Sequence, residues 1–94
     1  MVDVAPTRKG KRMHQTEIRM PKLSPKSDQY FFGTWEKQVG EHIQKGEVLF
    51  EVESEKVISE VPSEVTGVVA EQRVDEGATV KAGEVVGVVT VAND

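Results

Sequence analysis

The sequence contains no cysteine, few aromatic residues and no long apolar run. The absence of cysteine excludes disulfide bonds, thiolate metal ligands and cysteine nucleophiles. The two histidines, His14 and His42, are isolated and provide little material for metal binding or acid–base chemistry, so we expect neither a metal site nor catalytic residues. No apolar run approaches the roughly 18 residues that span a bilayer, and no apolar stretch follows the early basic residues as it would in a secretory signal. We therefore expect no membrane partner.

Charge divides the chain into two unequal parts. Residues 1–12 carry a net charge of +3, whereas residues 13–94 carry −7. The first part lacks apolar periodicity, which predicts a disordered basic tail over residues 1–15 and one small domain over residues 16–94. The run Arg8-Lys9-Gly10-Lys11-Arg12 would suit a nucleic-acid-binding arm. The acidic body would repel phosphate groups, so we expect no nucleic-acid partner.

The body has the sequence pattern of an all-β domain. Glycine and proline interrupt it every few residues, and no window between them carries a sustained helical stripe. In the segment Glu47–Glu53, Val48, Phe50 and Val52 alternate on one face, which places Leu49 on the other face with the glutamates. The aromatic residues Tyr30–Phe32, Trp35 and Phe50 are expected to pack in the core or at its edge. Strands are predicted at about residues 16–21, 30–37, 46–53, 57–62, 67–74 and 84–91.

An internal repeat with an offset of 37 residues indicates two similar halves. Residues 40–49 align with residues 77–86, and the apolar positions stay in step. Each half alone would expose its hydrophobic face, so we expect the halves to pack against each other about a pseudo-twofold axis. The identical pairs are Gly40/Gly77, Gly46/Gly83, Glu47/Glu84 and Val48/Val85.

The junction of the halves falls at Ser54-Glu55-Lys56-Val57, between two strand patterns. These polar residues predict a hairpin tip at one end of the domain, with both ends of the domain away from it. Lys56 is the single lysine at this tip and is flanked by carboxylates. A lysine on an ordinary acidic surface would look the same, but its place at the hinge of the repeat favours a specific role. A charged ammonium group is a poor nucleophile, which argues against catalysis by Lys56 itself.

From Thr16 to about Val91, the sequence resembles the lipoyl/biotinyl attachment domain family. The family's lysine motif, typically Glu-Thr-Asp-Lys-Ala, corresponds to Glu53-Ser54-Glu55-Lys56-Val57. One position departs from the family, because Tyr30 stands where glycine is usual, although Gly33-Thr34 nearby could mark a shifted alignment. The other matching segments are Met20-Pro21-Lys22-Leu23, Trp35, Val39-Gly40, Gly46-Glu47-Val48-Leu49, Glu60-Val61, Gly67-Val68-Val69 and Glu76-Gly77 with Val80 and Gly83.

The resemblance implies a flattened barrel or sandwich of two four-stranded antiparallel sheets, with the modified lysine at a hairpin tip. It implies a non-catalytic carrier in which Lys56 bears lipoate through an amide bond and moves acyl groups and reducing equivalents within a 2-oxo acid dehydrogenase complex. Glu53, Ser54, Glu55 and Val57 would then be recognised by the attaching enzyme. Biotin carriers usually place methionine on both sides of the lysine, whereas Glu55 and Val57 flank it here, as in lipoyl domains.

The implied partners are the lipoate-attaching enzyme, a thiamin diphosphate-dependent decarboxylase, an acyltransferase core and the flavoprotein dihydrolipoyl dehydrogenase. The implied location is the bacterial cytoplasm, or the mitochondrial matrix in a eukaryote. Two alternatives remain open: a biotin carboxyl carrier domain, and an unmodified structural domain of the same fold. A glycine-cleavage carrier usually has a longer chain that contains helices.

Overall fold

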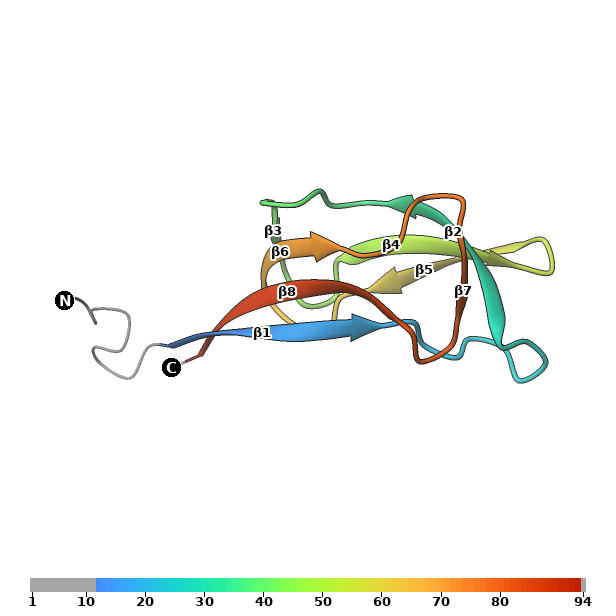
Figure 1. The fold of residues 1–94 in the computed structure, drawn as a ribbon, viewed down its shortest axis with the longest axis horizontal. Coiled ribbons are helices and arrows are strands. Elements are labelled where there is room, and N and C mark those ends of the chain that lie inside the picture. The colour runs from blue at the N-terminus through green and yellow to red at the C-terminus, as the bar shows by residue number, and fades with distance from the viewer. Residues whose placement is uncertain (1–11, 94) are drawn as a thin grey trace.

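A computed structural model describes residues 12–93 (Figure 1). Those residues form eight β-strands and no helix, so they contain no helix that could cross a membrane. The strands are β1 (Arg12–Arg19), β2 (Gln29–Trp35), β3 (His42–Ile43), β4 (Val48–Ser54), β5 (Val57–Pro62), β6 (Gly67–Gln72), β7 (Thr79–Lys81) and β8 (Val85–Asn93).

The strands form two four-stranded sheets with the orders β1-β8-β6-β3 and β5-β4-β2-β7. All neighbouring strands are antiparallel, and the sheets share no strand. The predicted fold class is therefore confirmed, as a sandwich that is not closed into a barrel. The predicted strand positions omit β3 and β7, whose two and three residues are too short to show alternation.

The internal repeat is confirmed by matching strands and matching hydrogen bonds. A shift of 37 residues carries β2, β3 and β4 onto β6, β7 and β8. The Gly40 amide donates to the carbonyl of Val69 at 2.8 Å, and the Gly77 amide donates to the carbonyl of Phe32 at 2.7 Å, which is the same bond in the other half. Gly40 and Gly77 have φ angles of 94° and 97°, a region that favours glycine.

The core lies between the sheets and centres on three aromatic rings. The ring centroid of Phe32 lies 4.8 Å from that of Trp35 and 5.0 Å from that of Phe50. The indole N–H of Trp35 donates to the carbonyl of Val74 at 2.9 Å, which satisfies this buried polar group. The predicted packing role is thus confirmed for these three aromatic residues.

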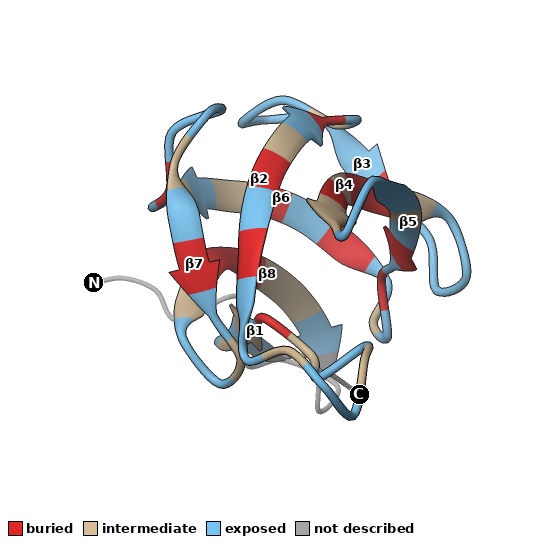
Figure 2. Cartoon of the chain, turned by 90° about the vertical axis from the view of Figure 1, so that its right-hand side faces the viewer, coloured by how far each residue is buried: buried red, intermediate tan, exposed pale blue. Residues whose placement is uncertain are grey.

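Two side chains differ from the alternation pattern of the sequence. Leu49 is 1% exposed rather than outward-facing, because the β4–β5 register shifts between Val48 and Phe50 and adds an inward residue. Phe31 is 48% exposed and lies on the opposite face of β2 from the buried Tyr30 and Phe32. Figure 2 shows buried and exposed bands alternating along this strand. Phe31 is therefore not a core residue.

The first strand begins earlier than predicted. Residues 12–15 pair with β8 from Arg12 opposite Asn93 to Gln15 opposite Thr90. The prediction of a disordered tail is therefore wrong for residues 12–15, and residues 1–11 lie outside the described residues. Because β1 and β8 are paired, the described ends of the chain lie together at one end of the domain (Figure 1).

Candidate attachment site at the β4–β5 turn

The β4–β5 connection is a two-residue turn formed by Glu55 and Lys56. Ser54 and Val57 are the last paired residues of the hairpin. Glu55 and Lys56 have φ angles of 53° and 69°, as a type I′ turn requires, and this turn matches the twist of the flanking strands. Among the described non-glycine residues, these two have positive φ. Backbone strain is thus concentrated at the predicted attachment residue.

The turn projects from the end of the sandwich opposite the paired ends of β1 and β8 (Figure 1). Figure 2 views the domain from this end. The geometry predicted from the repeat, with the lysine at one end and the ends of the domain at the other, is confirmed.

Lys56 is exposed to solvent, as are its neighbours Glu55 and Val57. Within the described part of the chain, its amine has no hydrogen bond or ion pair. Glu53 and Ser54 are half-buried at the end of β4. The structure therefore brings the predicted recognition residues together around an exposed primary amine.

The connection between β1 and β2 lies beside this turn, a feature that the sequence analysis missed. A hollow of about 150 Å³ separates the two and is lined by Leu23, Ser24 and Tyr30 on one side and by Ser54, Glu55, Val57 and Ser59 on the other. Pro25 is a turn signal in this connection, but the residue pattern does not indicate that it folds against the hairpin.

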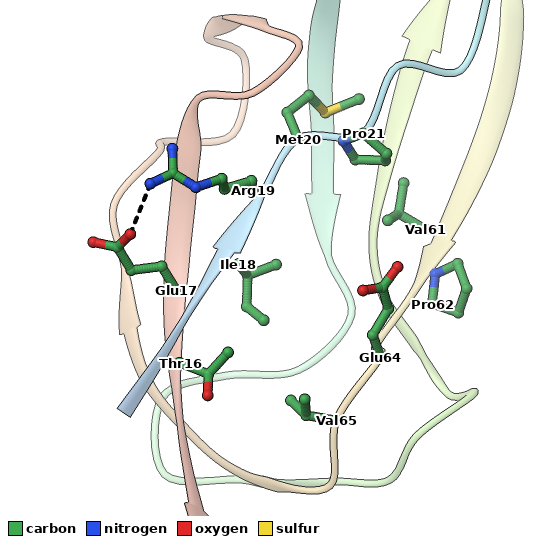
Figure 3. Close-up of a pocket in the computed structure, with 10 residues that line it drawn as sticks. All are labelled: Thr16, Glu17, Ile18, Arg19, Met20, Pro21, Val61, Pro62, Glu64 and Val65. Atoms are coloured by element: carbon green, nitrogen blue, oxygen red, sulfur yellow. Dashed lines mark hydrogen bonds and ion pairs between the residues drawn. The ribbon is translucent and has the colours of Figure 1, made fainter. Parts of the chain in front are cut away.

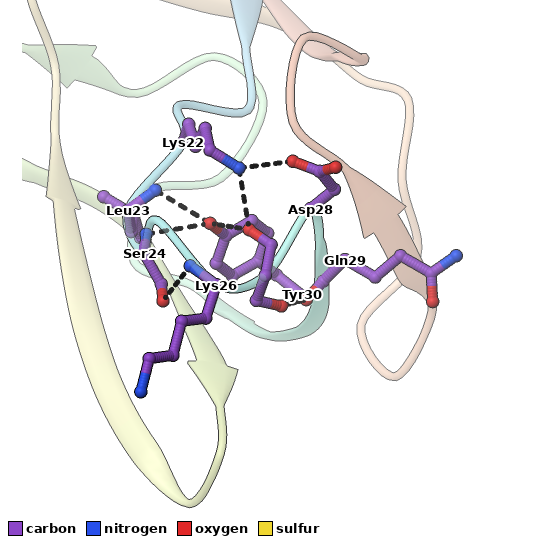
Figure 4. A network of polar contacts seen from close by, with 8 residues as sticks. Lys22, Leu23, Ser24, Lys26, Asp28, Gln29 and Tyr30 are labelled. Carbon is purple, nitrogen blue, oxygen red and sulfur yellow. Dashed lines mark hydrogen bonds and ion pairs between the residues drawn. The ribbon is translucent and has the colours of Figure 1, made fainter.

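Tyr30 holds the β1–β2 connection in place (Figure 4). Its hydroxyl accepts hydrogen bonds from the amides of Leu23 at 2.8 Å and Ser24 at 3.1 Å, and donates to the carbonyl of Ser27 at 2.8 Å. Tyr30 pairs with Val80, and their counterparts at the repeat offset of 37 residues, Gly67 and Ile43, also pair. Tyr30 therefore stands at the position of the repeat that Gly67 occupies in the other half, and the alignment is not shifted here.

Charged groups near the turn perturb one another. Lys22 donates a hydrogen bond to Asp28, which lowers the pKa of Asp28 and raises that of Lys22. On the outer face of β4, the pKa of Glu51 is raised by a hydrogen bond with Glu36, by partial burial, and by the charges of Glu36 and Glu60. This face therefore carries crowded carboxylates.

A second hollow, of about 360 Å³, lies where edge strands β1 and β5 face each other across the open side of the sandwich (Figure 3). Ile18, Met20, Val61 and Val65 contribute apolar side chains to it. No lysine lines it, so it is separate from the candidate attachment residue.

Comparisons with known proteins define the class of domain. Residues 16–89 match the biotin/lipoyl family profile, described as "Biotin-requiring enzyme". The solved lipoyl domain of the 2-oxoglutarate dehydrogenase complex from Azotobacter vinelandii is 32% identical, with a TM-score of 0.63 over 83% of this chain and 95% of that one. The chain belongs to the biotin/lipoyl attachment family.

The relatives identify the branch of the family. The chain is 36% identical, over 79% of its length, to the dihydrolipoyllysine-residue succinyltransferase component of the 2-oxoglutarate dehydrogenase complex from Bacillus subtilis. It is also 36% identical, over 83% of its length, to the acetyltransferase component of the pyruvate dehydrogenase complex from Corynebacterium glutamicum. The matched region spans 18% and 12% of those two proteins. The fold and these similarities are those of a lipoyl carrier domain.

Proposed function

We propose that Lys56 bears lipoate in amide linkage and that this domain carries acyl groups and reducing equivalents between the active sites of a 2-oxo acid dehydrogenase complex. The observation that carries the proposal is the exposed Lys56 amine, free of partners among the described residues, on a two-residue turn opposite the ends of the domain. The lipoyl domain similarity supports it. The domain itself is a non-catalytic carrier, because the chemistry would belong to the cofactor and to the enzymes that it visits.

The geometry of Lys56 suits attachment by a separate enzyme. The Nζ atom would lose a proton and attack the carbonyl carbon of activated lipoate, which forms the amide and releases the activating group. The protein supplies a fixed turn backbone that presents one amine, and small errors in such positioning reduce rates strongly. The bound lipoyl group supplies a dithiolane on a long arm, and its tether keeps the reacting group at high effective concentration near each active site.

The proposed partners follow from this function. They are the lipoate-attaching enzyme, a thiamin diphosphate-dependent decarboxylase, an acyltransferase core and a flavoprotein dihydrolipoyl dehydrogenase. Membership of such complexes by the Bacillus subtilis and Corynebacterium glutamicum relatives supports these assignments. A biotin carrier is the competing function, because the family includes biotin-requiring enzymes.

Intact mass after expression with both lipoate and biotin tests the function. We expect one lipoyl adduct on the unaltered protein and none on Lys56→Arg, because a guanidinium stays charged and cannot form the amide. The double change Glu55→Lys with Lys56→Glu keeps the net charge and moves the lysine by one residue. It should also remain unmodified. A biotinyl adduct, no adduct on the unaltered protein, or lipoate on another lysine would contradict the proposal.

A further inference from the structure

An apolar row crosses the outer face of the sheet next to the turn. The strand register places Ile58 opposite Glu53, and Glu53 opposite Phe31. These three residues lie on the opposite face from the buried Val52 and Phe32. Ile58 is 66% exposed and Phe31 is 48% exposed. Residues opposite one another on neighbouring strands lie within side-chain contact, so Glu53 stands between two exposed apolar side chains.

The internal repeat contains a second copy of this row, with a different composition. The counterpart of Phe31 is Val68, and that of Glu53 is Thr90, at the offset of 37 residues. Val68 pairs with Thr90, and Thr90 pairs with Gln15. At the end of the domain where the strand ends Arg12 and Asn93 pair, the row is therefore Gln15–Thr90–Val68.

The other half of the sandwich forms the equivalent strand pairing without the larger apolar side chains. Gln15 occupies the position that Ile58 has at the lysine end, and Val68 occupies the position that Phe31 has there. Exposed large apolar side chains gathered in one place are typical of interaction surfaces. The difference between the two rows therefore points to a partner at the lysine end.

The charges around the apolar row indicate the chemistry of that partner. Glu53 lies within the row, Glu55 lies in the adjacent turn, and the paired residues Glu51 and Glu60 lie on the same face further from the turn. A surface on which exposed apolar side chains stand beside carboxylates is complementary to apolar side chains that have lysine or arginine beside them.

We propose that Phe31 and Ile58, on either side of Glu53, form the docking surface for the enzyme that attaches lipoate to Lys56. The inference rests on the proposed function. An enzyme that acts on the Lys56 amine must contact the protein within a few residues of the turn, which places this row within its reach. One residue pair, Ser54 and Val57, separates the apolar row from the turn.

Initial rates of modification test the docking surface. The unmodified domain, a purified lipoate–protein ligase, ATP and lipoate are combined, and the adduct is followed by intact mass over a range of domain concentrations. The test variant carries Phe31→Val and Ile58→Gln, which are the residues of the internal counterpart. We expect KM for the domain to rise about tenfold with kcat within about twofold. High salt should raise KM of the unaltered domain.

A matched control carries Gln15→Ala and Val68→Ala in the counterpart row at the other end of the domain. It should leave both kinetic constants unchanged, and thermal unfolding should show that both variants are folded. An unchanged KM in the test variant, or an equal rise in the control, would overturn the docking surface while the modification of Lys56 still stood. If the unaltered domain accepts no lipoate, both proposals fail. If sedimentation shows a dimer for the unaltered domain and the control but a monomer for the test variant, the row would serve self-association and the docking proposal would be wrong.

Discussion

Removal of the Tyr30 hydroxyl should destabilise the domain by about 1–2 kcal/mol. The hydroxyl makes three hydrogen bonds, each of which contributes about 0.5–1.5 kcal/mol in a typical protein. The full sum is not expected, because Leu23 is exposed and Ser24 is half-buried, so water can replace part of the bonding to their amides. The Tyr30 ring stays buried in Tyr30→Phe, so no cavity opens in the core.

Thermal unfolding followed by circular dichroism gives the stability, and hydrogen exchange gives the location of the effect. For a domain of this size the expected loss lowers the midpoint by roughly 5–15 °C. Exchange should accelerate at the amides of Leu23 and Ser24 more than at those of β4. Ser27→Ala removes another hydroxyl of the same connection, one that bonds only to the Gln29 carbonyl among the described residues, and should cost less. A midpoint of Tyr30→Phe within about 1 °C of the unaltered protein, or unchanged exchange at both amides, would refute this account of the connection.

Three further changes test the turn, the acidic face and the packing of the repeat. Glu55→Gly should stabilise the domain by roughly 1 kcal/mol in chemical denaturation, because glycine adopts a φ of 53° without strain; a loss of stability would contradict the turn geometry. The pKa of Glu51 is raised above its ordinary value of 4.5, so the folded state binds the Glu51 proton more tightly than the unfolded state does. The free energy of unfolding should therefore fall as pH rises from about 4.5 through the raised pKa of the folded state. In thermal midpoints measured from pH 4 to 8, Glu51→Gln should show a weaker dependence on pH than the unaltered protein. Parallel plots of midpoint against pH for the two proteins would show that the contact with Glu36 does not raise the pKa of Glu51. Gly67→Ala should cost about 2 kcal/mol or more in denaturant titration, since an added Cβ would overlap the Thr90 carbonyl oxygen, and a neutral result would show that the backbone relaxes.

The sequence was sufficient to predict the repeat because glycine and apolar residues recur at fixed positions. Gly40 and Gly77 have the same backbone conformation and equivalent hydrogen bonds. The hairpin tip followed from the repeat, since its junction has to connect two strands. The lysine end could therefore be located from residue types and spacing alone, with the family resemblance supplying the chemistry.

The parts that the sequence did not predict depend on backbone pairing or on distant contacts. In residues 12–15 the side chains of Met13, His14 and Gln15 are exposed, so this part of β1 has no alternating pattern and forms through its pairing with β8. The bonds of the Tyr30 hydroxyl reach amides six and seven residues away, and side-chain hydrogen bonds of this kind have no sequence period. Leu49 turned inward because of a register shift that involves the partner strand as well.

The departures from internal symmetry gather at the lysine end. The connection from β1 to β2 spans residues 20–28, whereas its counterpart from β5 to β6 spans residues 63–66. The longer connection supplies the amides that bind the Tyr30 hydroxyl, and the residue equivalent to Tyr30 in the other half is Gly67. The repeat therefore supplies a frame that both ends share, and the residues that differ between the ends are those that surround Lys56.

The position of Lys56 follows from this frame. Strands β4 and β5 correspond to β8 and β1, so the turn between β4 and β5 takes the place where the strand ends Asn93 and Arg12 pair in the other half. A closed turn presents a side chain from a backbone held at both sides by strand pairing, whereas the paired strand ends Arg12 and Asn93 are not joined by a turn. A lysine at the turn is thus held far from the strand ends, as the proposed attachment of lipoate by a separate enzyme requires. The two-residue turn strains the backbone at Glu55 and Lys56, and the proposed attachment of lipoate would give this strained turn a function.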